Sequence, residues 1–352
     1  MKVRTRLALA LVGLLLLSAC ASPRNPQTSA MLTAVQRDVC ATIPSPTMRD
    51  PDSLSGENAM GWVLRLTCDY SASPPHLMAR VPGTPERERA ARLLHDGLRA
   101  AGWDASYQNF TGADYDALGK GSVANFAQCH HTDPRYERMA ALPFSNVVAD
   151  LGSGTPVQIL MAHYESKLNA SQDPDPDNHS RPVIGANDGA SGVGLLLEFA
   201  RVAAAHPPTG TLRILLVDGE DGFEDCHPLA GSIYYARGLS TAQRSDIGGV
   251  HLLDMVGDRN AHFCFAYNEM DLFTRWKEAA RNVSVPAVSG AAQCGVYDDH
   301  TAFTDLGMPG IDLIDFAGNE FPSYWHTTGD TPDRLAASRL EEVGRVLVEL
   351  FL

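Results

Sequence analysis

Residues 157–167 read Val-Gln-Ile-Leu-Met-Ala-His-Tyr-Glu-Ser-Lys, an apolar run that ends at a polar cluster. Residues 212–221 repeat this pattern, because Leu-Arg-Ile-Leu-Leu-Val is followed there by Asp-Gly-Glu-Asp. Between them, Gly-Ala-Asn-Asp-Gly-Ala-Ser-Gly at 185–192 leads into a segment with apolar residues at helical spacing. Short apolar runs that alternate with helices predict parallel strands. We therefore expect an α/β fold of three layers, in which helices cover both faces of a central, mixed, mostly parallel sheet.

The polar clusters at these strand ends predict a metal site. In open α/β sheets, ligands bind in the crevice at the carboxyl ends of the strands. One histidine and three acids lie there, and imidazole nitrogens and carboxylate oxygens are standard zinc ligands. The alternative is a set of surface carboxylates that only cap turns. That alternative suits any single residue, but it is weaker for a set at successive strand ends.

Length and composition set the broad class of protein. The chain has 352 residues, enough for one large domain or two small ones. A hydrophobic content of 44% and a charged content of 20% are typical of a globular enzyme. The formal net charge of -14 argues against a nucleic-acid partner, which would need a basic patch.

Residues 1–19 have the pattern of a lipoprotein signal peptide. A basic start precedes an apolar core at 7–17, which is too short for a typical membrane-spanning helix. Leu-Ser-Ala-Cys at 17–20 resembles a bacterial lipobox, which implies cleavage before Cys20 and a lipid on that residue. Loss of three basic residues from the 28 would give a mature net charge of 25 − 42 = −17. We expect an exported protein, anchored by lipid to a bacterial membrane at its periplasmic or outer-membrane face. An ordinary secretory signal with a chance cysteine is the alternative.

Cysteines and composition shifts indicate how the rest of the chain is organised. An even number of cysteines remains if Cys20 is lipidated, which suits up to three disulfides in an exported chain. The sequence does not choose among the pairings of Cys40, Cys68, Cys129, Cys226, Cys264 and Cys294. Residues 20–46, rich in Pro, Ser, Thr and Asn, are expected to form a tether. Residues 111–142 are polar and lack periodicity, which favours an insertion loop.

The remaining periodicity predicts further elements. An amphipathic helix is expected over 86–101, closed by Gly102. Apolar runs predict strands at 103–110, 144–149, 249–255 and 311–316, and a closing helix at 335–351. Asp254 lies in an otherwise apolar strand, where an acid is costly unless it is paired or bound to a metal. Residues 57–80 show no pattern that favours a particular structure.

Six motifs in order resemble metallopeptidase family 28, the zinc aminopeptidases that include the animal-type glutaminyl cyclases. The first three are the polar clusters at 163–167, 185–192 and 218–221. The others are Leu-Leu-Asp-Met-Val-Gly at 252–257, Asp-Asp-His at 298–300 and Trp-His-Thr-Thr-Gly-Asp-Thr-Pro-Asp at 325–333. The resemblance extends from Arg80 to the C-terminus. It implies a single zinc-dependent catalytic domain over 47–352.

The resemblance implies a metal-binding role for five residues. Asp188, Asp221 and His326 would hold the zinc ion. In two-metal aminopeptidases, His163 and Asp254 would hold a second ion, with Asp188 bridging the two. One ion would therefore be expected in a cyclase and two in an aminopeptidase.

Other roles are implied around this metal site. Glu220 would be the general base, because a carboxylate beside a metal ligand can take up and redeliver a proton. Glu165 would not bind the metal itself but would orient His163. Lys167 would also lie among the residues that surround the ligands. His300 is expected to be structural or to support the site rather than bind metal. Asp330 and Asp333 are expected to shape the loop after His326 and to cap the last helix.

Several marks resemble the cyclase branch in particular. They are the polar cluster at 163–167, residues 80–85, Phe-Ser-Asn at 144–146, Asp-Asp at 298–299 and Phe-Pro-x-x-Trp-His at 321–326. In that branch one zinc ion polarises the γ-carbonyl of an N-terminal glutamine, and the peptide's own α-amine attacks it. Asp254 would then bind the substrate amine instead of a metal. The resemblance also implies a proton network that includes Asp299, with Asp298 beside it, and a pocket lined by Phe321 and Trp325.

Three residues depart from the family pattern. Asp221 stands where a glutamate is usual, Glu165 where an aspartate is usual, and Cys226 about where the cyclases place a pocket tryptophan. We favour a cyclase that acts on the N-termini of peptides or proteins, over an aminopeptidase that hydrolyses the N-terminal residue. A non-catalytic binding protein on the same fold is a remote alternative. A second metal at His163 and Asp254 would distinguish the aminopeptidase.

Overall fold

The computed structural model describes residues 39–41, 53–118, 137–138, 140–206, 208–221, 229–316, 318 and 320–352. The expected signal peptide, the lipidation site at Cys20 and most of the tether lie outside these residues, as do Cys129, Cys226 and residues 119–136 of the expected insertion loop. Within the described ranges, no helix is both long and apolar enough to cross a membrane.

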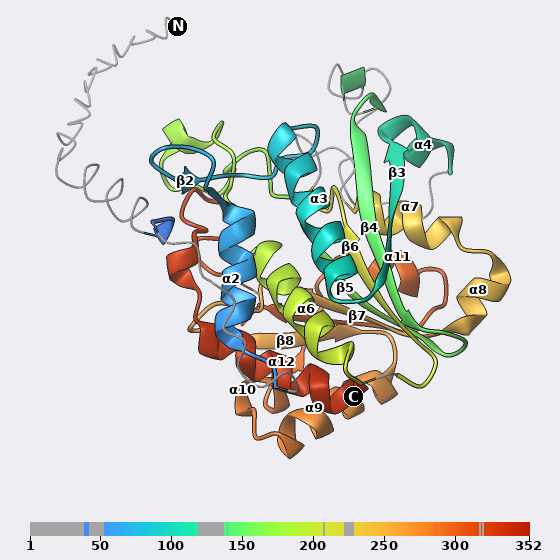
Figure 1. The fold of residues 1–352 in the computed structure, drawn as a ribbon. Helices are drawn as coiled ribbons and strands as arrows, with labels where there is room; N and C mark the ends of the chain where they lie inside the picture. The colour runs from blue at the N-terminus through green and yellow to red at the C-terminus, as the bar shows by residue number, and fades with distance from the viewer. Residues whose placement is uncertain are drawn as a thin grey trace, which may run out of the picture.

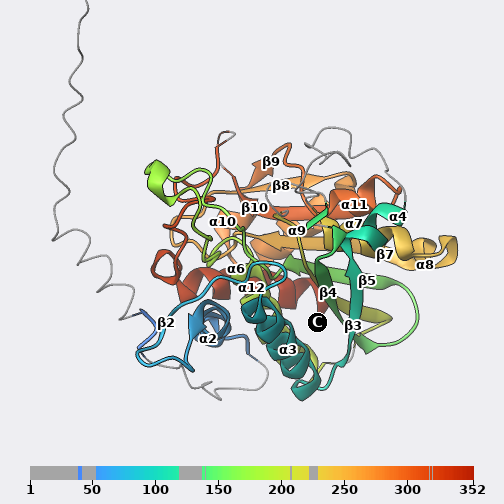
Figure 2. The ribbon, with the colours of Figure 1, turned by 90° about the horizontal axis from the view of Figure 1, so that it is seen from above.

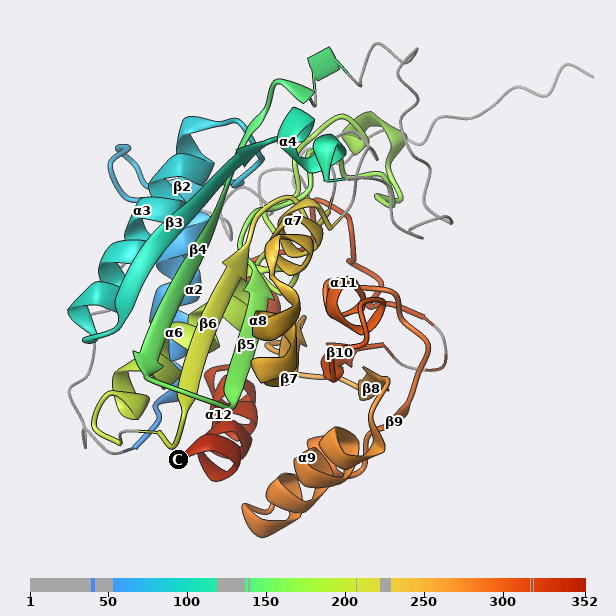
Figure 3. The same ribbon diagram turned by 90° about the vertical axis from the view of Figure 1, so that its right-hand side faces the viewer.

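An eight-stranded mixed sheet forms the centre of the molecule, in the order β3-β4-β6-β5-β7-β10-β8-β9. Three of its ladders, between β6, β5, β7 and β10, are parallel and adjacent, and the short ladder between β8 and β9 is parallel as well. The other three ladders are antiparallel. The expected mixed sheet is therefore confirmed, with its parallel part in the middle, as Figure 3 shows from the side of β3. The strands are β3 (Asp104–Thr111), β4 (Pro143–Gly152), β5 (Val157–His163), β6 (Thr211–Val217), β7 (Ile247–Asp254), β8 (Phe263–Tyr267), β9 (Ala292–Gln293) and β10 (Gly310–Asp315).

Helices cover both faces of this sheet, as expected. Alternate residues of the strands face opposite layers: Leu160 and Ala162 of β5 join one core cluster, and Ile159 and Met161 join the other. The first cluster contains α2 (Gly56–Thr67), α3 (Pro85–Ala100), α6 (Ala190–Ala203), α9 (Met270–Asn282) and α12 (Ala337–Phe351), most of which face the viewer in Figure 1. The second contains α7 (Ala230–Gly238) and α11 (Thr301–Thr304). Seen from above in Figure 2, α2 and α3 lie on the side of the sheet opposite α7 and α8 (Thr241–Asp246).

The remaining elements are short. They are the strand pair β1 (Cys68–Asp69) and β2 (His76–Leu77), the helices α4 (Gly112–Ala117) and α10 (Pro286–Ser289), and the 3-10 helices η1 (Pro176–Asn178) and η2 (Pro332–Arg334). The turn that ends α3 follows the expectation: Gly102 has a φ of 91°, a left-handed conformation that favours glycine. Two long helices, α2 and α9, and strand β8 were not predicted.

Two disulfides join described cysteines, Cys40 to Cys68 and Cys264 to Cys294. The first ties the start of the described chain to the end of α2, and the second ties β8 to the segment after β9. Disulfides persist in oxidising compartments such as the bacterial periplasm, so they support the expectation of an exported protein.

His251 on β7 is a buried histidine with a structural role. Its Nδ1 accepts a hydrogen bond of 3.0 Å from the indole Nε1 of Trp276, and its Nε2 lies 3.1 Å from Oε1 of Gln158. Its ring also packs edge-on against Phe351 of α12. Burial, with a smaller effect of Arg275, lowers the pKa of His251 to about 3. The folded protein therefore keeps this imidazole neutral over a pH range in which a free histidine is protonated.

We expect this difference to make stability fall in acid. The unfolded chain takes up a proton at His251 near its ordinary pKa of about 6.5, whereas the folded chain does so only near pH 3. Between those values this residue should lower the free energy of unfolding by about 1.4 kcal/mol for each unit that the pH falls. The variant His251→Gln should show a shallower pH dependence by up to that amount, measured by urea unfolding between about pH 6 and pH 4. Identical slopes in the two proteins would contradict this role.

Candidate active site

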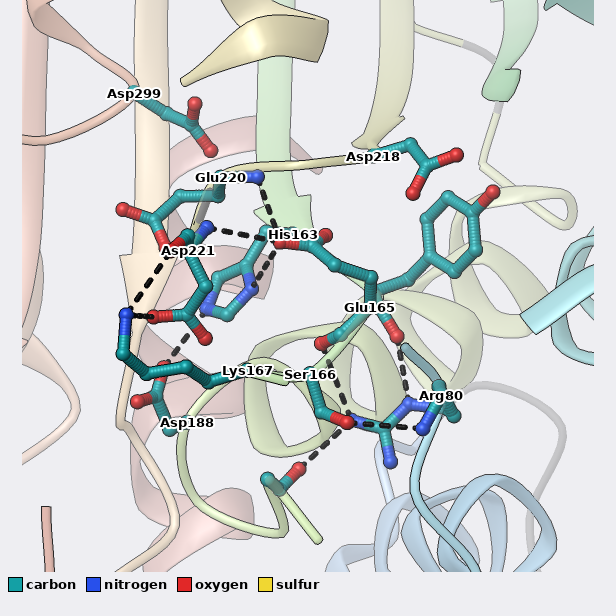
Figure 4. Close-up of polar contacts among 12 residues, drawn as sticks. Arg80, His163, Glu165, Ser166, Lys167, Asp188, Asp218, Glu220, Asp221 and Asp299 are labelled. Atoms are coloured by element: carbon teal, nitrogen blue, oxygen red, sulfur yellow. Dashed lines mark hydrogen bonds and ion pairs between the residues drawn. The ribbon is translucent and has the colours of Figure 1, made fainter. Parts of the chain in front are cut away.

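The carboxyl ends of the central parallel strands bring the expected polar residues together. His163 is the last residue of β5 and Asp254 the last of β7, and β6 leads through a tight turn to Glu220 and Asp221. Asp188 comes from the loop before α6. His326 enters from the loop after β10, so five segments that are distant in sequence contribute to one site. Figure 4 shows three of them, which carry His163, Asp188 and the pair Glu220 and Asp221.

Asp188, Asp221 and His326 form one candidate ligand group. His326 Nε2 lies 2.8 Å from Oδ1 of Asp221 and 3.4 Å from Oδ2 of Asp188. A tetrahedral zinc ion with ligands at roughly 2.0–2.2 Å separates its ligand atoms by roughly 3.3–3.6 Å. The spacing between His326 and Asp188 meets that requirement, whereas His326 and Asp221 lie closer together than it. One ligand atom from each of the three residues lies within 4.8 Å of the others.

His163, Asp188 and Asp254 form a second group on the other side of Asp188. His163 Nε2 lies 3.0 Å from Oδ1 of Asp188 and 3.3 Å from Oδ1 of Asp254. The two oxygens of Asp188 therefore face different histidines, which is the arrangement a bridging carboxylate needs. The same residues could hold a second ion, or they could hold one ion and a bound amine.

The chemistry of these residues fits a divalent cation. Oδ2 of Asp188 is buried and has no hydrogen-bond partner among the described residues, a costly state for a carboxylate oxygen unless a cation approaches it. Burial lowers the pKa of His326, but Asp221 and Asp188 outweigh it and raise the pKa to about 9. Burial also lowers the pKa of His163, but Glu165, Asp188 and Asp254 outweigh this effect and raise the pKa well above its ordinary value. Both shifts show that the carboxylates attract positive charge to the position of the ligands.

Asp188 is fixed by the backbone of its loop. The N–H groups of Asn187 and Asp188 donate to the buried carboxylate of Asp330, at 2.8 and 3.1 Å. Gly189 follows with a φ of 93°, and a side chain there would come within 2.9 Å of the His163 ring. The expectation that Asp330 and Asp333 cap the last helix is wrong, because α12 begins after Ala336 without a side-chain cap. Asp330 instead holds the loop that carries Asp188.

Glu165 holds the loop that carries Glu220 and Asp221. Its buried Oε1 accepts hydrogen bonds from the backbone N–H groups of Glu220 and Asp221, at 2.6 and 3.1 Å. The distance from Oε1 to Nδ1 of His163, the residue that Glu165 is expected to orient, is 3.6 Å. Lys167 supports the same loop, because its Nζ donates to the carbonyl oxygen of Asp221 at 3.1 Å.

Glu220 has further buried carboxylates near it. The carboxylate of Asp299 points toward Glu220 (Figure 4), and the hydroxyl of Ser232 donates to Oδ1 of Asp299. The N–H of Asp299 donates to Oδ1 of Asp298 at 2.5 Å. Burial and the charge of Asp221 raise the pKa of Glu220 well above its ordinary value. Burial also raises the pKa of Asp299 to about 7, against the effect of the Ser232 hydroxyl.

Aromatic rings cover one side of His326. The ring of Trp325 stacks on that of His326 with centroids 3.6 Å apart, and Phe321 stacks on Trp325 at 4.0 Å. His326 has a φ of 53°, which is uncommon for a residue other than glycine. Its carbonyl oxygen accepts a hydrogen bond of 3.1 Å from Gln172, so a second loop helps to hold this conformation.

Two buried residues at this site, Arg80 and Asp312, were not predicted from the sequence. Arg80 was noted only as part of a turn that resembles the cyclases, yet its side chain is fully buried behind the ligand loops. Asp312 on β10 is also fully buried, and neither carboxylate oxygen has a hydrogen-bond partner among the described residues. Asp312, like Asp254, is an acid inside an apolar strand, so the sequence contained the same signal at both positions. Cys226 and His227 lie outside the described residues.

The sequence pattern of peptidase family M28 matches residues 146–351, more than half of the chain. The chain belongs to this family. It is therefore a member of a family of zinc-dependent enzymes, as its six motifs predict. The match begins in β4 and includes all five candidate metal ligands.

Individual relatives cover most of the chain. A glutaminyl-peptide cyclotransferase-like protein of Bos taurus is 28% identical over 309 residues, which are 78% of this chain and 71% of the relative. The crystal structure of Tannerella forsythia glutaminyl cyclase has a TM-score of 0.69 at 24% identity and covers 85% of this chain and 98% of its own. The structure of a leucine aminopeptidase precursor from Bacteroides thetaiotaomicron has a TM-score of 0.68 at 25% identity, with coverages of 88% and 98%. The fold is therefore shared with proteins described as cyclases and as aminopeptidases.

We expect His326→Ala to bind one zinc ion fewer per chain than the unchanged protein, because a three-residue ligand group loses its only imidazole. The measurement is elemental analysis of zinc after dialysis of the folded protein. The matched control is His262→Ala, which removes an exposed histidine outside every candidate ligand group and should leave the zinc content unchanged. Full zinc content in His326→Ala would mean that the ligand group is wrong.

Proposed function

We propose that this enzyme is a glutaminyl-peptide cyclotransferase, which converts the N-terminal glutamine of a peptide to pyroglutamate and releases ammonia. The similarity to cyclases carries the choice of this reaction, and Glu220 has the position of the base that it needs. Glu220 lies beside the ligand group on one side, and the buried carboxylate of Asp299 points toward it from the other (Figure 4). A carboxylate in this position can take up a proton and deliver it again. The similarity to the bovine relative and to the bacterial cyclase supports the same reaction.

The reaction needs one bond to form and one to break at the side-chain carbonyl carbon of glutamine, Cδ. The α-amine nitrogen bonds to this carbon and loses a proton, while the side-chain nitrogen gains a proton and leaves as ammonia. Zinc, held by Asp188, Asp221 and His326, would polarise the γ-carbonyl as a Lewis acid. Glu220 is the residue that takes the proton from the amine and delivers it to the leaving nitrogen.

The other residues bind and orient the substrate. Asp254 has an oxygen that faces the site at 3.3 Å from His163 and would bind the α-amine. The stack of Phe321 and Trp325 supplies an apolar wall for the glutamine side chain. Asp299 and Asp298 extend the path by which Glu220 exchanges its proton, and Glu165 and Lys167 hold the Glu220 loop in place.

One specific observation favours the alternative, an aminopeptidase. His163, Asp188 and Asp254 are spaced as a second ligand group, so the site could hold two ions. A pair of ions bridged by Asp188 would position and activate a water molecule for hydrolysis of the first peptide bond. The two reactions share a metal, a base and an amine-binding acid, and the number of bound ions distinguishes them. A non-catalytic binding protein is the remote alternative, because every candidate ligand and the base are present.

We also propose that the enzyme acts outside the cytoplasm, where it meets the N-termini of exported peptides and proteins. The two disulfides support export. The lipobox-like segment at 17–20 supports attachment to a membrane through a lipid on Cys20.

The test of this proposal uses the purified soluble form that starts after Cys20. We expect it to convert a peptide with N-terminal glutamine to a product that is lighter by one ammonia, as followed by mass spectrometry. A matched peptide with N-terminal leucine should remain intact. Removal of the leucine would instead support the aminopeptidase and two bound ions, and no change in either peptide would contradict both reactions.

We expect Glu220→Gln to lower kcat by roughly 10²–10⁴-fold, because the amide cannot accept the proton of the attacking amine. Zinc content should stay at the level of the unchanged enzyme, since Glu220 is not in the proposed three-residue ligand set. The two measurements are single-substrate kinetics with the glutamine peptide and elemental analysis of zinc. A rate within a few-fold of the unchanged enzyme would exclude Glu220 as the base.

A further inference from the structure

Arg80 is a buried cation with an unusual set of partners. Its side chain is fully buried, and in the described part of the chain its guanidinium donates only to main-chain carbonyl oxygens. Nε donates to Tyr164 at 2.6 Å, and Nη1 donates to Ile184 at 2.9 Å. Nη2 donates to Gly185 at 2.8 Å and to Glu165 at 3.4 Å. One planar group thus binds four carbonyls from two separate loops.

These two loops carry the groups of the active site. The first, at 163–167, begins with His163 and contains Glu165, whose carboxylate in turn holds the N–H groups of Glu220 and Asp221. The second, at 184–188, ends with Asp188. Arg80 therefore lies where the support of both loops converges, as Figure 4 shows. Its own backbone joins the first loop as well, because its N–H donates to Oγ of Ser166 at 2.9 Å and its carbonyl accepts from the N–H of Ser166.

The packing leaves little freedom around the guanidinium. Gly185 has a φ of 63°, and a side chain at this position would come within 3.2 Å of Nη2 of Arg80. The carboxylates of Glu165, Asp330 and Asp188 interact electrostatically with this charge. A fixed positive charge behind the loops partly offsets the repulsion among acids that have to stay close together before any cation binds.

We propose that Arg80 is the positioning residue that clamps the two ligand loops together, so that the zinc site is formed in the metal-free protein. It binds neither metal nor substrate itself. The inference depends on the ligand group proposed above only for its effect on zinc binding. The effect on the loops is a property of the metal-free protein and can be measured separately.

The geometry of the guanidinium, more than its charge, is what the clamp requires. Arginine directs five N–H donors in one plane, whereas lysine has three donors on a single nitrogen. Arg80→Lys keeps the positive charge but cannot reach carbonyls of both loops at once. Arg80→Gln removes the charge and retains two donors. The pair of variants separates the two contributions.

The first experiment measures hydrogen exchange in the metal-free protein. We expect Arg80→Lys to raise exchange in peptides that cover 163–167 and 184–190, and to leave α9 and α12 unchanged. The matched control is Arg213→Lys, because Arg213 binds Asp150 and Tyr235 and touches neither loop. That control should show unchanged exchange in both loops. Unchanged exchange in Arg80→Lys would overturn the proposal.

The second experiment measures zinc affinity by competition with a chelator. Supporting residues behind metal ligands typically contribute 10–100-fold to affinity, and we expect a loss of this size in Arg80→Lys. If Arg80→Lys binds zinc with wild-type affinity and Arg80→Gln binds it weakly, the charge of Arg80 alone is sufficient. That result would overturn the proposed clamp. If the loops of Arg80→Lys exchange faster while both variants keep wild-type zinc affinity, the ligand group is wrong and the clamp stands.

A milder variant covers the case in which Arg80→Lys does not fold. Ser166→Ala removes the acceptor of the Arg80 N–H and leaves the guanidinium and its four carbonyls in place. It should raise exchange at 163–167 and weaken zinc binding by a few-fold. Wild-type behaviour of Ser166→Ala in both measurements would also overturn the proposal.

Discussion

Repulsion among buried carboxylates is the constraint on which the rest of this structure depends. Asp188, Asp221, Asp254 and Glu220 meet at one edge of the sheet, with Asp298, Asp299 and Asp312 close behind. Burial and these neighbouring charges raise the pKa of Asp254, Asp298 and Asp312, as they do for Glu220. Such a cluster is unfavourable unless positive charge and backbone dipoles compensate it. The structure provides both from the side of the loops, through Arg80 and backbone N–H groups, and a bound metal would add positive charge from the other side.

The topology makes this concentration of charge possible. Parallel strands place all their carboxyl ends at one edge, and the three adjacent parallel ladders of β6, β5, β7 and β10 lie at the middle of the sheet. The polar loops are therefore surrounded by structure on both sides. Helices on both faces exclude water from the strands beneath, so the polar groups have to find partners within the protein. Backbone N–H groups meet this need at Asp330 and Glu165, and carbonyl oxygens meet it at Arg80.

Periodicity and polar clusters at strand ends were sufficient to predict the sheet, its two helical faces and the gathering of ligands. They did not predict elements and contacts whose residues form no clear pattern in the sequence. In α9, Leu272, Trp276 and Ala280 have helical spacing, but charged residues between them conceal the pattern. Arg80 could not be interpreted because its partners are main-chain carbonyls, which carry no sequence signature. Asp330 was expected to cap the last helix but binds the loop before α6, because a carboxylate can accept from any nearby N–H group and only the fold determines which one.

Asp221 and Glu165 each differ by one methylene from the acid that is usual at their position, and the two differences are connected. Asp221 is one methylene shorter than the glutamate usual at the ligand position, so its backbone would have to approach a bound metal more closely. Glu165 is one methylene longer than the usual aspartate and grips the N–H groups of Glu220 and Asp221 with one oxygen. Lys167 holds the carbonyl of Asp221 from the same loop. The resulting position leaves Oδ1 of Asp221 at 2.8 Å from Nε2 of His326, so the two side chains reach the same point. The longer supporting acid thus compensates for the shorter ligand, and neither substitution argues against a working zinc site.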